Sequence, residues 1–259
     1  MKFHKLNIIH FISFFLCFSF IHLALAETQH RLYGTMQINN KGHLEIGGVD
    51  VVNLAKDNEY PIYVIDEELL RNNIQAYKNS LKQNYKETSA VFYSANGGIN
   101  LALCKIIEQE GIGLAITTEG QLYTALQANF PAANIIMHGN NKSSRELERA
   151  LEANVGYIVM DNMEEILLLE QMARKLKKIP NVLIRIKPQI AVSANSHYSI
   201  HKNESKFGFY ISQPETLKSI ELLHQSPAIN FLGLHTNIGP QNLELNKYEQ
   251  VIINNSLIK

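Results

Sequence analysis

A stretch over residues 91–102 joins a buried strand to polar groups that could take part in chemistry. Its sequence, VFYSANGGINLA, predicts a strand, a polar tip, a glycine turn and the start of a helix. Ser94 and Asn96 give this tip a hydroxyl and a carboxamide, which donate and accept hydrogen bonds. The tip has no amine nucleophile, because the sequence contains no lysine between Lys86 and Lys105.

The composition excludes several classes of protein. Apolar residues make up 46% of the 259 residues, which is enough for a sizeable core and too many for a disordered chain. The 24 basic and 24 acidic residues cancel, so the chain lacks the net charge that steers proteins to nucleic acids. The ten histidines do not show the HExxH spacing of a metal site, and we predict no metal.

The first 26 residues predict an export signal rather than part of the fold. Lys2 and Lys5 form a basic start, residues 8–25 are mostly apolar, and the sequence ALA ending at Ala26 fits the small-residue rule for cleavage. Because polar residues interrupt the apolar run, a cleaved signal peptide is favoured over a membrane helix. We therefore expect an exported, periplasmic protein that is cleaved near Ala26 and has no stable membrane anchor.

Residues 27–66 are expected to form an N-terminal arm with one or two edge strands. The run PIYVID at 61–66 predicts a short strand whose last residue, Asp66, starts a helix over about 67–83. This helix has few apolar positions, so we expect it to lie at the surface. Residues 67–259 are then expected to form the main domain.

From residue 91 onward, apolar strands alternate with amphipathic helices at nearly even spacing. The predicted strands begin near residues 91, 113, 134, 157, 182 and 231. Helix starts are predicted by capping boxes that begin at Ser143 and Asp161, and by Pro214 in a first helical turn. Such alternation requires a parallel sheet covered by helices, and the lack of a GxGxxG turn favours a (β/α) barrel over a doubly wound sheet.

The number of strands sets a further expectation about the fold. The sequence supplies six strands and ends at Lys259 inside the helix after the sixth, whereas a closed barrel of this type has eight. We therefore predict an α/β fold, an incomplete (β/α)8 TIM-type barrel with about six of eight strands. The longest interval, between the strands near 182 and 231, places an insertion at the carboxyl end of a strand, where barrels build active sites.

Five short phrases occur in order along the chain: PIYVID at 61–66, GQLY at 120–123, HGNNKS at 138–143, SKFGF at 205–209 and GLHTNIGPQ at 233–241. On these phrases the sequence resembles the diaminopimelate decarboxylases from about residue 42 to residue 250. The resemblance implies pyridoxal 5'-phosphate as the cofactor, and a barrel of the type shared with ornithine decarboxylase and alanine racemase. It also implies a C-terminal β domain, which we expect to be missing here.

The amine that this family uses to hold its cofactor is absent. In the family, a strand ending Tyr-Ala-x-Lys-Ala-Asn supplies the lysine that forms an imine with the cofactor aldehyde. An ungapped alignment puts Asn96 at the lysine position, and a gapped alignment puts Ser94 there. Because neither side chain can form an imine, we predict no catalytic residue and do not expect covalent attachment of the cofactor.

The resemblance makes five residues candidates for binding the cofactor: Asn96, His138, Ser205, His235 and Asn237. Asn237 stands where the family has a histidine that stacks on the pyridine ring. Ser205 either donates to the phosphate or starts a turn, and His138 either lies near the cofactor or is a buried histidine with satisfied hydrogen bonds. His235 either lines the barrel mouth or simply ends a strand.

Three lysines lie in the motifs or at a strand end. Lys142 and Lys206 resemble motif lysines that do not form the imine, and ion-pair or surface roles are expected for them. Lys187 ends a strand in which period-two alternation places it on the same face as Arg185. A relocated imine-forming lysine at Lys187 is therefore an alternative.

The resemblance implies the decarboxylation of meso-diaminopimelate to lysine, with a small amino acid as substrate and a homodimer as the assembly. Without the lysine, we expect a chain that is inactive in this reaction, or a truncated relative. Two alternatives stay open: an exported, non-catalytic protein that binds an amino acid or an anion, and a periplasmic pyridoxal-phosphate-dependent racemase. The racemase needs the same lysine.

Overall fold

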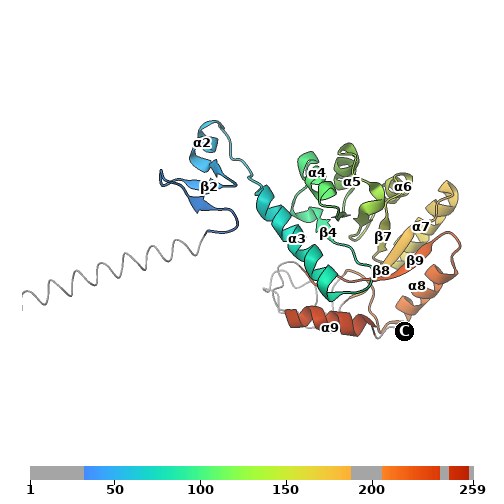
Figure 1. Ribbon diagram of the computed structural model, residues 1–259. Helices are drawn as coiled ribbons and strands as arrows, with labels where there is room; N and C mark the ends of the chain where they lie inside the picture. Colours follow the sequence, from blue (N-terminus) through green and yellow to red (C-terminus); the bar gives the residue numbers. More distant parts are fainter. Residues whose placement is uncertain (1–31, 188–205, 240–244, 257–259) are drawn as a thin grey trace, which may run out of the picture. The chain divides into compact units, whose positions relative to one another are not determined.

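The computed structural model describes residues 32–187, 206–239 and 245–256 (Figure 1). The chain divides into two compact units, residues 1–84 and residues 85–259. The predicted export signal at 1–26 and the candidate Ser205 lie outside the described residues.

The described part of the first unit is a small antiparallel sheet with two helices. Its strands are β1 (Gln37–Ile38), β2 (Leu44–Ile46) and β3 (Val49–Asp50), and its helices are α2 (Val51–Lys56) and α3 (Glu67–Asn84). The arm thus has three strands that pair in a sheet of their own, where the sequence predicts one or two edge strands. Gly47 and Gly48 have positive φ angles and form the tight turn between β2 and β3.

The prediction of a strand at 61–66 is wrong, because these residues form no strand and are mostly exposed. The apolar run has β propensity, but the three strands of the arm pair only with one another, and propensity without a neighbouring strand does not make a sheet. The role of Asp66 at the helix start is confirmed. Its carboxylate accepts hydrogen bonds from the Leu69 amide at 2.9 Å and from the Thr35 hydroxyl at 2.6 Å. Ile74 is the one buried side chain of α3, so the surface position predicted for this helix is also confirmed.

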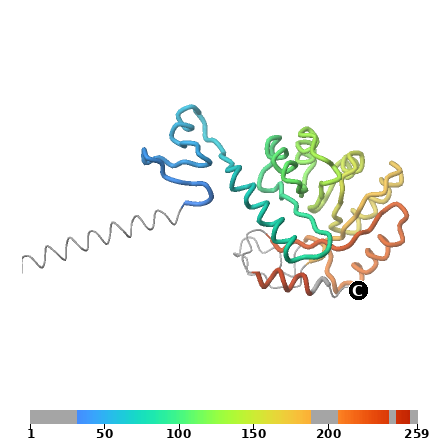
Figure 2. Tube along the Cα trace, in the orientation of Figure 1, coloured from blue at the N-terminus to red at the C-terminus, as the bar shows by residue number. Residues whose placement is uncertain are grey.

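The second unit contains six parallel strands whose order in the sheet is their order in the chain. They are β4 (Phe92–Ser94), β5 (Gly113–Ile116), β6 (Ile135–Met137), β7 (Tyr157–Met160), β8 (Asn181–Arg185) and β9 (Asn230–His235). Each begins within one residue of its predicted start, so the strand predictions and the α/β class are confirmed. Figure 2 follows the backbone through this alternation of strands and helices.

Helices connect and cover these strands. They are α4 (Leu101–Gln109), α5 (Glu119–Gln127), α6 (Ser144–Glu152), α7 (Met163–Leu176), α8 (Pro214–Gln225) and α9 (Leu245–Ser256), and short 3-10 turns lie at Ala95–Gly97 and Ala132–Asn134. In Figure 1, α4 to α7 form an arc outside the strands. The core lies between these two layers and contains side chains that are fully buried, among them Ile107, Leu114, Leu122, Ile135, Leu147, Ile158, Ile166 and Ile184.

Two of the three predicted helix starts are confirmed. Ser143 and Glu146 form a reciprocal capping box, and Pro214 occupies the first turn of α8. The capping box predicted at Asp161 is wrong by one residue, since Asn162 is the N-cap of α7 and accepts a hydrogen bond from the Glu165 amide at 2.9 Å. The structure explains the shift, because the carboxylate of Asp161 is engaged elsewhere.

The sheet is strongly curved. His138 follows β6 and His235 ends β9, with two strands between them, yet their ring centroids are 5.8 Å apart. Adjacent strands are about 4.8 Å apart, so three steps across a flat sheet would span roughly 14 Å. The two rings therefore meet inside a curled sheet, as in a partial barrel. Within the described residues, no helix is both long enough and apolar enough to span a membrane.

Candidate functional site

The tip of β4 carries both residues that align with the missing lysine. Ser94 ends the strand and Asn96 lies in the turn that follows, and both are exposed. Gly98, with a φ of 117°, turns the chain toward α4. Asn100 then caps this helix by accepting a hydrogen bond from the Leu103 amide at 2.8 Å. The local sequence thus presents a hydroxyl and a carboxamide at the carboxyl edge of the sheet.

A small network of hydrogen bonds holds this tip to the next strand and helix. The Thr117 hydroxyl oxygen lies 3.0 Å from the Asn96 side-chain oxygen and 3.2 Å from the Gln121 side-chain oxygen, so its single proton bonds one of them at a time. Gln121 also accepts from the Thr117 amide at 2.7 Å and donates to the Ala95 carbonyl at 3.3 Å. The carboxamide of Asn96 is therefore part of a local structural network. The GQLY phrase contains Gln121, but nothing in its sequence indicates this role.

A buried ion pair joins the loop after β6 to the helix after β7. The Lys142 ammonium is 2.7 Å from the Glu165 carboxylate, and the two side chains are 1% and 5% exposed. Glu165 also accepts hydrogen bonds from the amides of Lys142 at 2.8 Å and Asp161 at 3.0 Å. Burial lowers the pKa of Lys142, and the charge of Glu165 opposes this effect. The expected ion-pair role of Lys142 is confirmed.

A second buried ion pair joins β7 to β8. Arg185 lies 3.2 Å from the carboxylate of Asp161, and its guanidinium carbon is 4.9 Å from the centre of the Phe207 ring. Burial raises the pKa of Asp161, and the charge of Arg185 opposes this rise. This contact explains why Asp161 does not cap α7. The Lys187 ammonium lies 3.5 Å from the centre of the Tyr210 ring, and this contact does not test the alternative of imine formation at Lys187.

The two candidate histidines lie side by side at the carboxyl edge of the sheet. The backbone of His138 is fixed by a bond from its amide to the Ile116 carbonyl at 2.8 Å. Both Nδ1 atoms are buried and have no hydrogen-bond partner among the described residues. Burial, followed by nearby positive charges, lowers the pKa of His138 to about 4 and that of His235 to about 3. Both rings are therefore neutral at pH 7.

The remaining candidates make local contacts or fall outside the described residues. Asn237, aligned with a ring-stacking histidine, accepts a hydrogen bond from the Gly239 amide at 2.8 Å. Ser205 lies outside the described residues. Among the five candidates, the structure thus brings His138 and His235 together. Asn96 instead lies within hydrogen-bond distance of Thr117, and Asn237 accepts a hydrogen bond within its own loop. Among the described residues, no group of three histidine, cysteine or acidic side chains could hold a metal.

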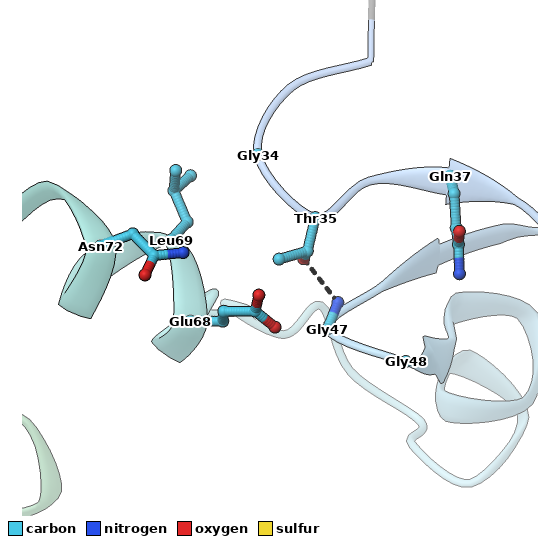
Figure 3. A pocket seen from close by; sticks show the side chains of 8 residues that line it. All are labelled: Gly34, Thr35, Gln37, Gly47, Gly48, Glu68, Leu69 and Asn72. Atoms are coloured by element: carbon cyan, nitrogen blue, oxygen red, sulfur yellow. Dashed lines mark hydrogen bonds between the residues drawn. The ribbon is translucent and has the colours of Figure 1, made fainter.

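The first unit contains a separate cavity of about 440 Å³ (Figure 3). It is lined by Gly34, Thr35, Gln37, Gly47, Gly48, Glu68, Leu69 and Asn72. The Thr35 hydroxyl accepts a hydrogen bond from the Gly47 amide at 2.7 Å, and Glu68 supplies a carboxylate to this lining. The cavity shares no residue with the strand tips of the second unit.

A curled parallel sheet covered by helices, with polar side chains at the carboxyl ends of its strands, defines a (β/α) barrel-type protein. The family profile of the pyridoxal-dependent decarboxylases, pyridoxal binding domain, matches residues 69–256. The chain belongs to this family, whose cofactor is pyridoxal phosphate.

Individual relatives agree with this assignment. The chain is 39% identical over 211 residues to the diaminopimelate decarboxylase of Bacillus subtilis (strain 168), covering 81% of this chain and 48% of the relative. It is 37% identical over 209 residues to the Bacillus methanolicus diaminopimelate decarboxylase, with the same coverage of each chain. The crystal structure of the M. jannaschii diaminopimelate decarboxylase in co-complex with L-lysine is similar with a TM-score of 0.75 and 28% identity, over 83% of this chain and 50% of that one. The chain therefore spans about half the length of the curated relatives it matches.

The tip of β4 does not fit a covalently held pyridoxal phosphate. Imine formation requires a nucleophilic amine. At the tip of β4, Ser94 offers a hydroxyl and Asn96 a carboxamide within hydrogen-bond distance of Thr117. No chemical step at the cofactor aldehyde can therefore be assigned to this tip.

Proposed function

We propose that this chain is a relative of diaminopimelate decarboxylase that does not form the imine with pyridoxal phosphate and does not decarboxylate diaminopimelate. The observation that carries the proposal is the tip of β4, where Asn96, within hydrogen-bond distance of Thr117, or Ser94 aligns with the family lysine. The nitrogen lone pair of a carboxamide is delocalised into its carbonyl group and does not attack an aldehyde. Loss of the amine argues equally against a racemase, which needs the same imine.

The proposed ligands follow from the relatives. The similar M. jannaschii enzyme was crystallised in co-complex with L-lysine, and we propose a small amino acid as the ligand of the present chain. We also propose a homodimer and, from the sequence of residues 1–26, export to the periplasm. Each of these properties is open to measurement on the intact chain.

Borohydride trapping tests the absence of the imine. The full chain is mixed with pyridoxal phosphate and reduced, and the mass of the protein and its peptides is measured. We expect no stoichiometric adduct at any one lysine of the wild-type protein. A stoichiometric adduct in the wild type, above all at Lys187, would overturn the proposal.

Two matched variants sharpen the trapping experiment. Asn96→Lys restores an amine at the ungapped position, and we expect reduction to attach the cofactor at residue 96. Ser94→Lys restores an amine at the gapped position and tests that alternative alignment. The variant that gives the higher yield at low cofactor concentration identifies which residue of the tip faces the cofactor aldehyde.

A further inference from the structure

We infer that His138 and His235 together form a binding site for an oxyanion, either a carboxylate or a phosphate group. The site lies where β6 and β9 end, at the carboxyl edge of the curled sheet. The inference rests on the proposed function for its setting, because it places the recognition of an anionic ligand in the pyridoxal binding domain. It does not depend on whether an imine forms.

The first argument is the state of the two Nδ1 atoms. Both are buried and have no hydrogen-bond partner among the described residues, although buried polar atoms in proteins are nearly always bonded. A neutral imidazole carries its proton on one nitrogen, so either ring can present an N–H donor at Nδ1. A ligand oxygen that accepts from both rings would satisfy two otherwise unbonded atoms at once.

The second argument is that the two rings lie next to each other. They come from strands that are not neighbours, and their centroids lie 5.8 Å apart with 33° between the ring planes. The two imidazoles whose Nδ1 atoms have no partner among the described residues therefore lie next to each other at the carboxyl edge of the sheet. The curvature of the sheet has thus brought two imidazole rings from distant parts of the chain next to each other, where one small ligand could contact both.

The third argument is the sign of the nearby charge. Arg185 is the register partner of His235 across β8 and β9, and the Lys142 ammonium donates to the carbonyl of Gly139, the residue after His138. These two cations are the charged residues that lower the pKa values of both histidines, and no carboxylate of the described residues contributes to either shift. Each cation is paired with a carboxylate, yet the cations are the members of these pairs that act on the two rings, and this disfavours a metal ion there.

The carboxylates in this region are already engaged. Asp161 is paired with Arg185, and Glu165 is paired with Lys142 while it accepts two backbone hydrogen bonds. The two acids are therefore held in place by their own partners rather than by the histidines. The histidine pair could therefore bind a ligand that carries its own negative charge.

Titration of the imidazole signals tests the site. The full chain, with nitrogen-15 in its histidines, is titrated with inorganic phosphate, with acetate and with diaminopimelate in separate experiments, and the ring nitrogen shifts are followed by NMR. We expect saturable shifts at both His138 and His235 for at least one of these anions. Saturation by phosphate alone assigns the site to a phosphate group, whereas saturation by acetate and diaminopimelate assigns it to a carboxylate.

Variants separate specific binding from general salt effects. His138→Asn and His235→Asn are each expected to weaken the anion affinity at least tenfold. The exposed His224, which contacts the Phe231 ring, is the matched control, and His224→Asn should leave the affinity unchanged. The proposal is overturned if the wild-type signals do not move with any of the three anions, or if they move without saturation.

The anion titration and the trapping experiment test separate claims, and either claim can fail without the other. The wild-type titration involves no borohydride and no imine, so it decides the oxyanion site even if an adduct is found at a lysine. Conversely, the absence of an adduct is expected whether or not phosphate or acetate binds between the rings.

Discussion

Burial controls the protonation of the two histidines at the ends of β6 and β9. It holds their pKa values at about 4 and about 3, whereas both would titrate near 6.5 in the unfolded chain. At a pH between the folded and unfolded pKa values, the histidines bind protons in the unfolded state but not in the folded state. The free energy of unfolding contributed by His138 and His235 is therefore complete above pH 6.5 and is lost as the pH falls toward about 4 for His138 and about 3 for His235.

This difference predicts a stability profile that can be measured. Urea unfolding between pH 7 and pH 5 should give a free energy of unfolding that decreases with falling pH. In the double variant His138→Asn with His235→Asn, the decrease should be smaller over the same range, because the groups that take up protons on unfolding are gone. A profile as steep as that of the wild type would contradict the assignment of these protons to the histidine pair.

The loops and helices after β6 and β7 depend on one carboxylate. Glu165 holds the Lys142 ammonium and two backbone amides, so it ties the HGNNKS loop to the start of α7. Removing one member of a buried pair leaves the other charge without compensation. We therefore expect Lys142→Met to destabilise the fold by about 3–5 kcal/mol, measured as the free energy of urea unfolding.

An exposed pair supplies the control for this substitution. Lys105 lies 2.9 Å from Glu108 on the surface of α4, and Lys105→Met should cost at most about 1 kcal/mol. Adding Glu165→Gln to Lys142→Met should recover part of the loss, since it removes the uncompensated charge. Equal effects of Lys142→Met and Lys105→Met would show that burial does not strengthen the Lys142 pair.

The elements of the second unit could be predicted from sequence because their signals are local. Val- and Ile-rich strands, helical periodicity and the Ser143 capping box are all properties of adjacent residues. The errors arise where a distant partner decides the outcome. Asp161 has the sequence of a helix cap but binds Arg185, and the 61–66 run has the sequence of a strand but no strand to pair with.

The same division holds for the candidate site. Strand ends and motif resemblance single out His138 and His235 one at a time. Their contact depends on the curvature of the sheet, which no local pattern encodes. Thr117 escapes prediction because its role arises only from its distance to Asn96 and Gln121. The sequence predicts that Lys142 can form an ion pair, but it does not indicate that Glu165 is the partner.

Export of the entire chain is the property that residues 1–26 predict. Expressed at full length in a Gram-negative bacterium, the protein should be recovered from the periplasm with a mass that corresponds to a chain starting at Glu27. Phe15→Arg places a charge in the apolar run, and we expect it to leave the protein uncleaved in the cytoplasm. Recovery of uncleaved wild-type chain from the cytoplasm would contradict the predicted signal.

The hydrogen bonds of Thr117 have a consequence for how the missing amine could be regained. The Thr117 hydroxyl has a second acceptor in Gln121, so a lysine at position 96 would leave that hydroxyl bonded. Asparagine and lysine codons differ only in their third nucleotide. One nucleotide change could thus return an amine to the tip of β4 without breaking the link between Gln121 and Ala95, and selection for imine chemistry would face a short evolutionary path.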